Sequence, residues 1–122
     1  MRGKTTVNRR AKGAAYEALA AEYLESLGYD ILVRNYYGRR GELDMIAQEG
    51  GVLVFIEIKY RKSGTSGQPW EAVDKRKQFR MIHTAKEYMM EKHLSMQTPC
   101  RFDVVSILGR EITLYKNAFG EA

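Results

Sequence analysis

A run of apolar residues rich in β-branched side chains, VLVFIEIKY at 52–60, constrains the fold of this chain most. Both alternating faces of the run are apolar as far as Glu57, which is typical of a strand in the middle of a sheet covered on both sides. Residues 42–48 (ELDMIAQ) form a second strand pattern, and Gly50 and Gly51 between the two supply the positive φ values of a tight turn. The sequence therefore predicts a central β-hairpin in a layered domain.

Helical and strand patterns flank this hairpin. Residues 9–27 carry apolar side chains at helical spacing, and Gly28 is predicted to end that helix in a left-handed conformation. A second helix is predicted over residues 70–94, with Ile82 in its buried stripe. Further strands are predicted at residues 29–35, 101–108 and 111–115. The order α-β-β-β-α-β-β predicts an α/β domain with a mixed sheet of about five strands flanked by helices.

The length and composition fit one domain, residues 1–122, in which we expect flexible ends at residues 1–8 and 117–122. No apolar run approaches the roughly 20 residues of a membrane-spanning helix, and no apolar segment follows the basic start as in a secretory signal. Cys100 is the single cysteine, which excludes an internal disulfide and fits a reducing cytosol. We therefore expect a cytoplasmic protein without a membrane partner.

Positive charge exceeds negative charge, with 20 Lys and Arg against 15 Asp and Glu and a net charge of +5. This balance favours polyanionic partners such as nucleic acid. Each basic residue taken singly also fits a solvated surface position, whereas together they form an electrostatic track for phosphates. The candidate nucleic-acid contacts are Arg39, Arg40, Arg61, Arg76 and Lys77, together with Gln78, which can bind a water or phosphate or lie at the solvent border.

Glu57 and Lys59 project from the same face of the predicted strand, because side chains two residues apart point the same way. If Gly50 and Gly51 form the turn, Asp44 on the neighbouring strand faces Glu57, with Cβ atoms about 5 Å apart. Two carboxylates at that distance repel each other unless one takes up a proton or a cation lies between them. The alternative is an exposed Glu/Lys pair on a surface hairpin, and the burial of Glu57 distinguishes the two.

Mg²⁺, or Mn²⁺ in its place, is the cation that this carboxylate pair favours. It binds carboxylate and carbonyl oxygens, keeps several waters and accepts substrate phosphate at its remaining positions. Asp44 and Glu57 are the predicted ligands, and the backbone carbonyl of Ile58 is a further candidate. Lys59 faces Glu42 in the same register and can pair with it. We expect Lys59 to orient a water or to stabilise negative charge on the phosphate.

Two motifs at the predicted hairpin, G-E-L-D at Gly41–Asp44 and V-F-I-E-I-K-Y-R at Val54–Arg61, resemble the core of the PD-(D/E)xK nucleases. From about residue 9 to 108 the chain more closely resembles the bacterial YraN-type family of predicted endonucleases, which is distantly similar to archaeal Holliday junction resolvases. The likeness also includes Gly13, Glu17, Asn35, Glu71–Val73, Lys77-Gln78 and Arg101–Asp103.

The resemblance implies a restriction-endonuclease-like three-layer core and a Mg²⁺ site. By motif it assigns Asp44 and Glu57 as metal ligands and Lys59 as the catalytic lysine. It adds Glu17, at the edge of the apolar arc of the first helix, as a residue that can complete the metal site. A solvated carboxylate at the helix border is the alternative for Glu17.

Three functions fit these features. The first is a Mg²⁺-dependent endonuclease that hydrolyses phosphodiester bonds of DNA, with branched or otherwise structured DNA as the substrate that the resemblance implies. The second is a non-catalytic nucleic-acid-binding or adaptor module that retains the nuclease fold, and the third is a purely structural partner protein. Because resolvases act as dimers on two strands, a homodimer is also expected from the resemblance.

Overall fold

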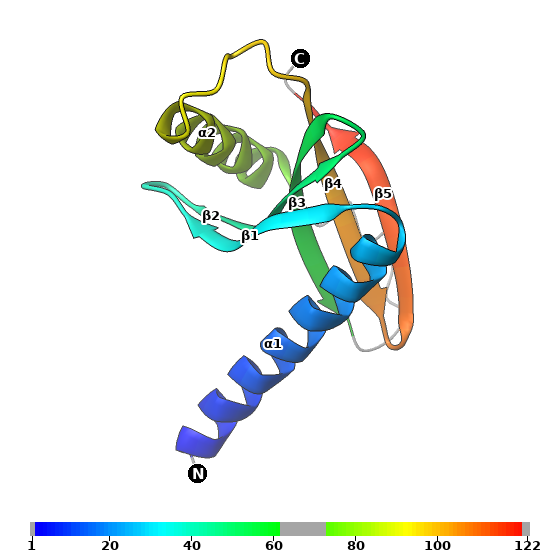
Figure 1. The fold of residues 1–122 in the computed structure, drawn as a ribbon. Coiled ribbons are helices and arrows are strands. Elements are labelled where there is room, and N and C mark those ends of the chain that lie inside the picture. The colour runs from blue at the N-terminus through cyan, green and yellow to red at the C-terminus, as the bar shows by residue number, and fades with distance from the viewer. Residues whose placement is uncertain (1, 62–72, 121–122) are drawn as a thin grey trace.

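The structure, a computed structural model, describes residues 2–61 and 73–120, and the side chains from residue 13 onward. Its elements follow the predicted order, α-β-β-β-α-β-β, which confirms an α/β fold (Figure 1). They are α1 (Arg2–Ser26), β1 (Asp30–Tyr37), β2 (Glu42–Glu49), β3 (Val52–Arg61), α2 (Lys75–Glu91), β4 (Cys100–Leu108) and β5 (Glu111–Phe119).

The five strands form one mixed sheet in the order β1-β2-β3-β4-β5. Neighbouring strands are antiparallel except β3 and β4, which are parallel and are connected through α2. Parallel neighbours need a crossover of this kind, because a tight turn reverses the chain direction. The run that dominates the sequence therefore forms the central strand, as predicted.

The two faces of β3 belong to different hydrophobic cores. Phe55 packs in one core with residues of α2, including Met81 and Tyr88. Val54 and Ile56 pack in the other core, where α1 contributes Ala20, Ala21 and Leu24. The sheet therefore lies between α1 and α2, and both faces of its central strand are removed from water.

α1 ends where the sequence predicts. Gly28 has a φ of +97°, its N–H donates to the carbonyl of Glu25, and the N–H of Tyr29 donates to the carbonyl of Leu24. This pair of bonds is a Schellman motif, which satisfies carbonyls at the helix end. The start of α1 differs from the prediction, since the helix begins at Arg2 and includes the backbone of residues 2–8.

α2 is shorter than the predicted helix over residues 70–94, of which residues 70–72 lie outside the described part of the chain. The helix begins after Asp74, whose carboxylate accepts the N–H of Lys77 at 2.8 Å. It ends at Glu91 because His93 adopts a φ of +58° and the N–H of Leu94 turns back to the carbonyl of Met89. The buried side chains are Met81, Thr84, Ala85, Tyr88 and Met89, whereas Ile82, predicted in this stripe, is half-buried.

β5 is longer than predicted, since it continues to Phe119. The ring of Phe119 stacks on Phe102 of β4 with centroids 4.9 Å apart. Residues 117–119, predicted within a flexible end, therefore belong to the sheet because an aromatic pair holds them there.

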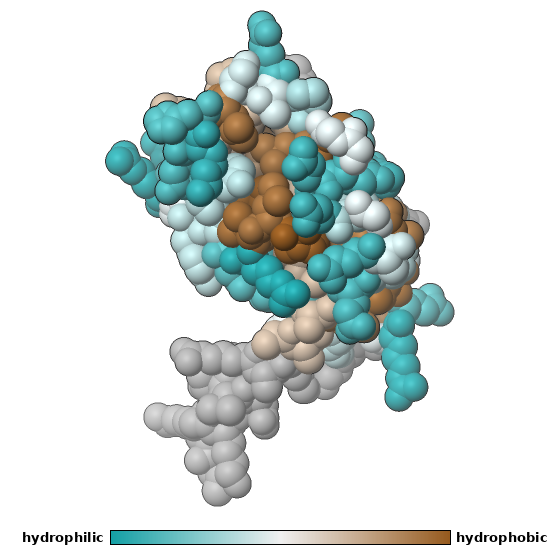
Figure 2. All heavy atoms as spheres, in the orientation of Figure 1, coloured by the Kyte–Doolittle hydropathy of each residue, from teal (hydrophilic) through white to brown (hydrophobic). Residues whose placement is uncertain are grey.

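Apolar side chains also reach the surface. Figure 2 shows a patch of them in the upper half of one face, surrounded by hydrophilic residues. Leu32, Leu53 and Leu94 line a shallow groove of about 280 Å³. Within residues 2–61 and 73–120, no helix has the length and apolar character that crossing a membrane requires.

Candidate active site

The β2–β3 hairpin has the predicted register. Gly50 and Gly51 take φ values of +58° and +80°, and the paired positions run from Glu49 opposite Val52 to Met45 opposite Ile56. One further step along both strands brings Asp44 to the level of Glu57. The backbone pairing of the two strands ends there. Oδ2 of the Asp44 side chain accepts a hydrogen bond from the N–H of Ile58 at 2.7 Å instead.

The side chains of β2 change face at Asp44, whose carboxylate is directed toward β3. Leu43 and Ile46 contribute to the core on the α2 side, whereas Met45 contributes to the core on the α1 side. The three-residue spacing departs from the two-residue repeat of a regular strand. The residue of β1 at this level is Asn35, which has a φ of +56°. The unusual backbone of Asn35 therefore coincides with the change of face at Asp44.

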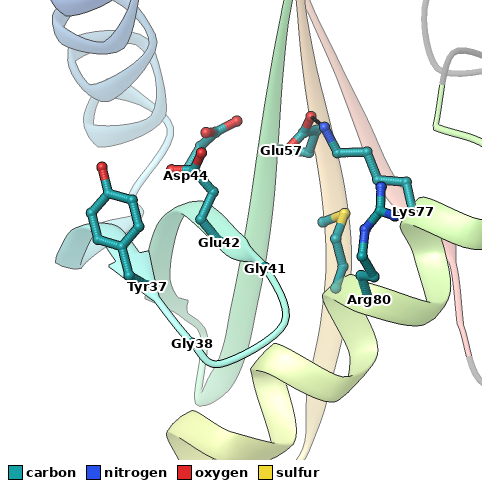
Figure 3. Close-up of a pocket in the computed structure, with 9 residues that line it drawn as sticks. Tyr37, Gly38, Gly41, Glu42, Asp44, Glu57, Lys77 and Arg80 are labelled. Atoms are coloured by element: carbon teal, nitrogen blue, oxygen red, sulfur yellow. Dashed lines mark ion pairs between the residues drawn. The ribbon is translucent and has the colours of Figure 1, made fainter.

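A cleft of about 430 Å³ opens beside these residues. Figure 3 shows Tyr37 on the β1–β2 side of the cleft and Lys77 and Arg80 on the α2 side, with the carboxylates between them. The lining residues are Tyr37, Gly38, Gly41, Glu42, Asp44, Glu57, Lys77, Arg80 and Met81. The cleft therefore joins the open end of the hairpin to the first two turns of α2.

Glu57 is a buried carboxylate, with 4% of its surface exposed. Its Oε2 forms ion pairs with two ammonium groups, that of Lys59 at 3.4 Å and that of Lys77 on α2. An exposed Glu/Lys pair on a surface hairpin is therefore the wrong interpretation. The expected pairing of Lys59 with Glu42 is also not found among the described residues, because the ammonium of Lys59 lies on Glu57 instead.

The environment alters the ionisation of Asp44. Burial, followed by the nearby charge of Glu57, raises the pKa of Asp44 to about 7, against the opposing effect of the Ile58 N–H. Burial lowers the pKa of Lys77, but its contact with Glu57 outweighs burial, so that the net pKa is raised. Two acidic and two basic side chains thus share one partly buried cluster, in which Asp44 is poised to gain or lose a proton near neutrality.

The donor atoms of this cluster fit Mg²⁺ or Mn²⁺. Asp44 and Glu57 supply carboxylate oxygens. The N–H of Ile58 donates to Asp44, and the carbonyl of Ile58 points to the same edge of the strand as that N–H, so it also faces Asp44. Across residues 2–61 and 73–120, no three His, Cys, Asp or Glu side chains lie close enough to hold an ion. Mg²⁺ accepts such a sparse set because it keeps several waters and binds substrate phosphate.

Glu17 is not among the residues that line the cleft. Its Oε1 accepts a hydrogen bond from the side-chain amide of Asn35 at 2.9 Å, which ties α1 to β1 at the residue with a positive φ. Asp44 is the neighbour of Asn35 on β2. Glu17 thus contacts the strand next to Asp44, and its direct role as a metal ligand stays a prediction.

The predicted nucleic-acid contacts lie at different distances from the cleft. Lys77 lines it, while Gln78 donates from its side-chain amide to the carbonyl of Val73 at 2.9 Å and so braces the start of α2. The other candidates lie in the β1–β2 turn (Arg39 and Arg40, both exposed), at the end of β3 (Arg61) and in the first turn of α2 (Arg76, exposed). Arg80, which is not among the predicted contacts, also lines the cleft, three residues after Lys77 on the same helical face.

The β1–β2 turn is fixed against α2. The N–H of Arg39 donates to both carboxylate oxygens of Glu87, at 3.0 and 3.2 Å. A Cβ atom at Gly38 would lie 2.7 Å from Glu87 Oε1, so a larger residue here would displace the end of the Glu87 side chain. A second groove of about 810 Å³ adjoins the cleft here, with Tyr37 and Gly38 in both linings.

This chain has many relatives among bacterial proteins. Residues 16–107 match the family described as "Uncharacterised protein family UPF0102". The chain belongs to this family. A UPF0102 protein of Lachnoclostridium phytofermentans is 50% identical over 113 residues, which cover 93% of this chain and 96% of the relative. A UPF0102 protein of Brachyspira hyodysenteriae is 40% identical over 118 residues, which cover 92% of this chain and 98% of the relative.

A third relative carries the name that the sequence motifs suggested. The UPF0102 protein YraN of Salmonella newport is 37% identical over 116 residues, which cover 94% of this chain and 88% of the relative. The predicted family membership is therefore confirmed. These UPF0102 proteins match this chain over most of their own length, so the domain described above accounts for most of each of them.

Proposed function

We propose that this UPF0102 protein is a Mg²⁺-dependent endonuclease that hydrolyses phosphodiester bonds of DNA, with branched or otherwise structured DNA as its substrate. One observation carries the proposal. Asp44 and the buried Glu57 line a cleft together with Lys77 and Arg80, and Lys59, which is not in the lining, pairs with Glu57 at 3.4 Å. Acidic ligands beside basic phosphate-binding groups are what metal-assisted phosphodiester hydrolysis requires.

In this proposal the chain holds the ion and positions the phosphate. Asp44, Glu57 and the Ile58 carbonyl would hold Mg²⁺ or Mn²⁺, with Glu17 as the further ligand that the PD-(D/E)xK resemblance assigns. Bound there, the ion would lower the pKa of a water and neutralise charge on the phosphate. Lys59 would orient that water or stabilise the negative charge that develops on the phosphate oxygens.

Basic residues around the cleft would bind the DNA backbone. Lys77 and Arg80 line the cleft, and Arg39 and Arg40 line the groove that adjoins it. Arg61 and Arg76 extend the positive charge from the end of β3 and the start of α2. Contacts of this kind position a duplex without reading its sequence, so we expect binding that weakens steeply with salt.

A cleavage assay tests the proposal. Four-way junction, flap, single-stranded and duplex DNA are incubated with the full chain and Mg²⁺, Mn²⁺ or EDTA. We expect cleavage with either metal, none with EDTA, and a loss of at least about 100-fold in Glu57→Gln. Glu22→Gln, which changes an exposed carboxylate of α1, is the matched control, and circular dichroism verifies that both variants fold.

A non-catalytic nucleic-acid-binding or adaptor module is the second candidate. The observation that favours it is the pairing of Glu57 with both Lys59 and Lys77, which balances the buried charge without a metal ion. It predicts salt-dependent DNA binding that is unchanged in Asp44→Ala/Glu57→Ala, with no turnover on any substrate. Cleavage that depends on Glu57 would exclude it.

The resemblance to resolvases extends the proposal to a homodimer, in which two copies would act on two strands. Sedimentation equilibrium, with and without junction DNA, measures the mass of the protein in solution. A monomer under both conditions would remove the dimer from the proposal and leave the chemistry of the site unchanged.

A further inference from the structure

Lys77 occupies an unusual place for a surface lysine. It belongs to the first turn of α2, where its N–H donates to the capping carboxylate of Asp74. Its ammonium crosses the cleft to Glu57 Oε2, as Figure 3 shows. The side chain of Lys77 keeps 32% of its surface exposed, whereas the side chain of Glu57 keeps 5%. One partner is thus fixed in the sheet, and the other reaches it from solvent.

The oxygen that Lys77 contacts is one that the proposed site needs. Glu57 Oε2 also pairs with Lys59, so two positive charges converge on a single carboxylate oxygen. Lys59 projects from the same strand as Glu57, two residues away, so the strand backbone keeps their attachment points close together. Lys77 comes from another element on a long, flexible stem, so rotation about its side-chain bonds can carry the ammonium away.

We infer that Lys77 is a built-in competitor of the divalent cation for Glu57, which leaves the carboxylate when the ion binds and then pairs with a phosphate of the DNA. The inference rests on the proposed function. In the metal-free protein Lys77 stabilises a buried carboxylate that would otherwise lack part of its compensating charge. When the ion takes that role, the ammonium is released beside Arg80, in the cleft that the DNA backbone would enter.

Release of Lys77 couples the two binding events. The ammonium that leaves Glu57 is stabilised most when a DNA phosphate is present to pair with it. DNA therefore favours the metal-bound state. Binding linkage is reciprocal, and the metal therefore strengthens DNA binding by the same factor. Lys77 would accordingly weaken metal binding in the free protein and strengthen it in the complex with DNA.

Binding of Mn²⁺ to the full chain without DNA, followed by electron paramagnetic resonance, tests the competition. Lys77→Met and Lys77→Gln remove the competing charge, and we expect each to bind Mn²⁺ about tenfold more tightly than the wild type, equivalent to about 1.4 kcal/mol. Lys77→Arg keeps the charge and should not tighten binding. Lys75→Met, an exposed lysine of the same helical turn, controls for the change in net charge and should stay within about twofold.

A second measurement adds a phosphorothioate four-way junction that resists cleavage. We expect the junction to tighten Mn²⁺ binding at least about fivefold more in the wild type than in Lys77→Met. A third follows the Lys77 Cε resonance of the wild type during a Mg²⁺ titration, where it should shift as the ammonium leaves Glu57. This measurement serves even if both neutral variants fail to fold.

The outcomes separate this inference from the proposed function. If the wild type binds Mn²⁺ and both neutral variants bind it equally well, Lys77 is not a competitor, while the nuclease proposal stands. An unshifted Lys77 resonance at saturating Mg²⁺ has the same meaning. If neither the wild type nor any variant binds Mn²⁺, with or without the junction, the metal-dependent function and the inference both fail.

Discussion

Asp44 accepts a hydrogen bond from the backbone N–H of Ile58 at 2.7 Å, across the open end of the β2–β3 hairpin. A side chain thus continues the cross-strand contacts beyond Met45 and Ile56, the last paired positions of this hairpin. The bond fixes the carboxylate of Asp44 next to that of Glu57, where burial and like charge both oppose its ionisation.

Asp44→Asn should change how stability depends on pH. The pKa of Asp44 is raised from 3.8 to about 7 in the folded protein, so between these values the folded chain keeps a proton that the unfolded chain has lost. The free energy of unfolding of the wild type should therefore fall, relative to Asp44→Asn, by about 2–4 kcal/mol as pH rises from 4 to 7. Urea unfolding of both proteins at several pH values measures this difference, and parallel pH profiles would refute the prediction.

Asp103→Ala should destabilise the protein by about 3–5 kcal/mol, because it leaves a charged network without its centre. Asp103 is fully buried and accepts hydrogen bonds from the Tyr29 hydroxyl at 2.8 Å, from Arg101 at 3.0 Å and from the N–H of Asn117 at 2.9 Å. Denaturant unfolding at pH 7 measures the loss. Asp30→Ala, which changes an exposed residue of β1, should stay within about 0.5 kcal/mol. Equal effects of the two variants would contradict the assigned network.

Asn35→Ala should lower the stability of the protein more than Asn35→Gly. Alanine is strained at a φ of +56° and also loses the hydrogen bond to Glu17, so we expect a loss of about 2–3 kcal/mol. Glycine accepts the backbone conformation and loses the bond alone, at about 1 kcal/mol. Thermal and urea unfolding establish the order. An alanine variant as stable as the glycine variant would show that the backbone at this position relaxes.

Glu17→Gln separates a metal ligand from a structural carboxylate. The amide oxygen of glutamine can still accept the hydrogen bond from Asn35, so stability should stay within about 0.5 kcal/mol of the wild type. Loss of the negative charge should weaken Mn²⁺ binding at least about fivefold if Glu17 completes the metal site. Calorimetric titration with Mn²⁺ measures the affinity. Unchanged affinity would leave Glu17 as a brace for Asn35.

Gly38→Ala should loosen the β1–β2 turn from α2. The added Cβ would meet Glu87 Oε1 at 2.7 Å and push this carboxylate off the N–H of Arg39. We expect the free energy of unfolding to fall by about 1–2 kcal/mol. Gly13→Ala is the matched control, because nothing lies within 4 Å of its Cβ position in α1, and it should stabilise by about 0.5–1 kcal/mol. Adding Glu87→Ala should relieve most of the effect of Gly38→Ala; a purely additive double variant would exclude the clash.

Local rules explain why much of the hairpin was predictable. The positive φ values that two consecutive glycines favour set the turn, the turn set the register, and the register brought Asp44 to the level of Glu57. The ends of α2 were less predictable. Its last turn is stopped by His93 in a left-handed conformation, which is uncommon outside glycine and which no pattern in the sequence indicates.

The partner of Glu57 on α2 depends on long-range packing. Lys77 follows Glu57 by 20 residues, and its ammonium meets that carboxylate because Met81 and Tyr88 dock α2 on the sheet at one particular height. A helical pattern shows which face is buried but not where along the sheet the helix comes to rest. The sequence therefore predicts Lys77 as a phosphate contact, but it does not show that Lys77 is a counter-ion of Glu57.

The parallel pairing of β3 with β4 has a consequence for the order of folding. The β2–β3 hairpin closes over a two-residue turn. Residues 52–61 pair with residues 100–108 only after the long crossover connection between the two strands has closed. Closing a long loop loses more entropy than closing a short one, and contacts distant in sequence form later. During refolding Asp44 and Glu57 should therefore come together before α2 brings Lys77 to them.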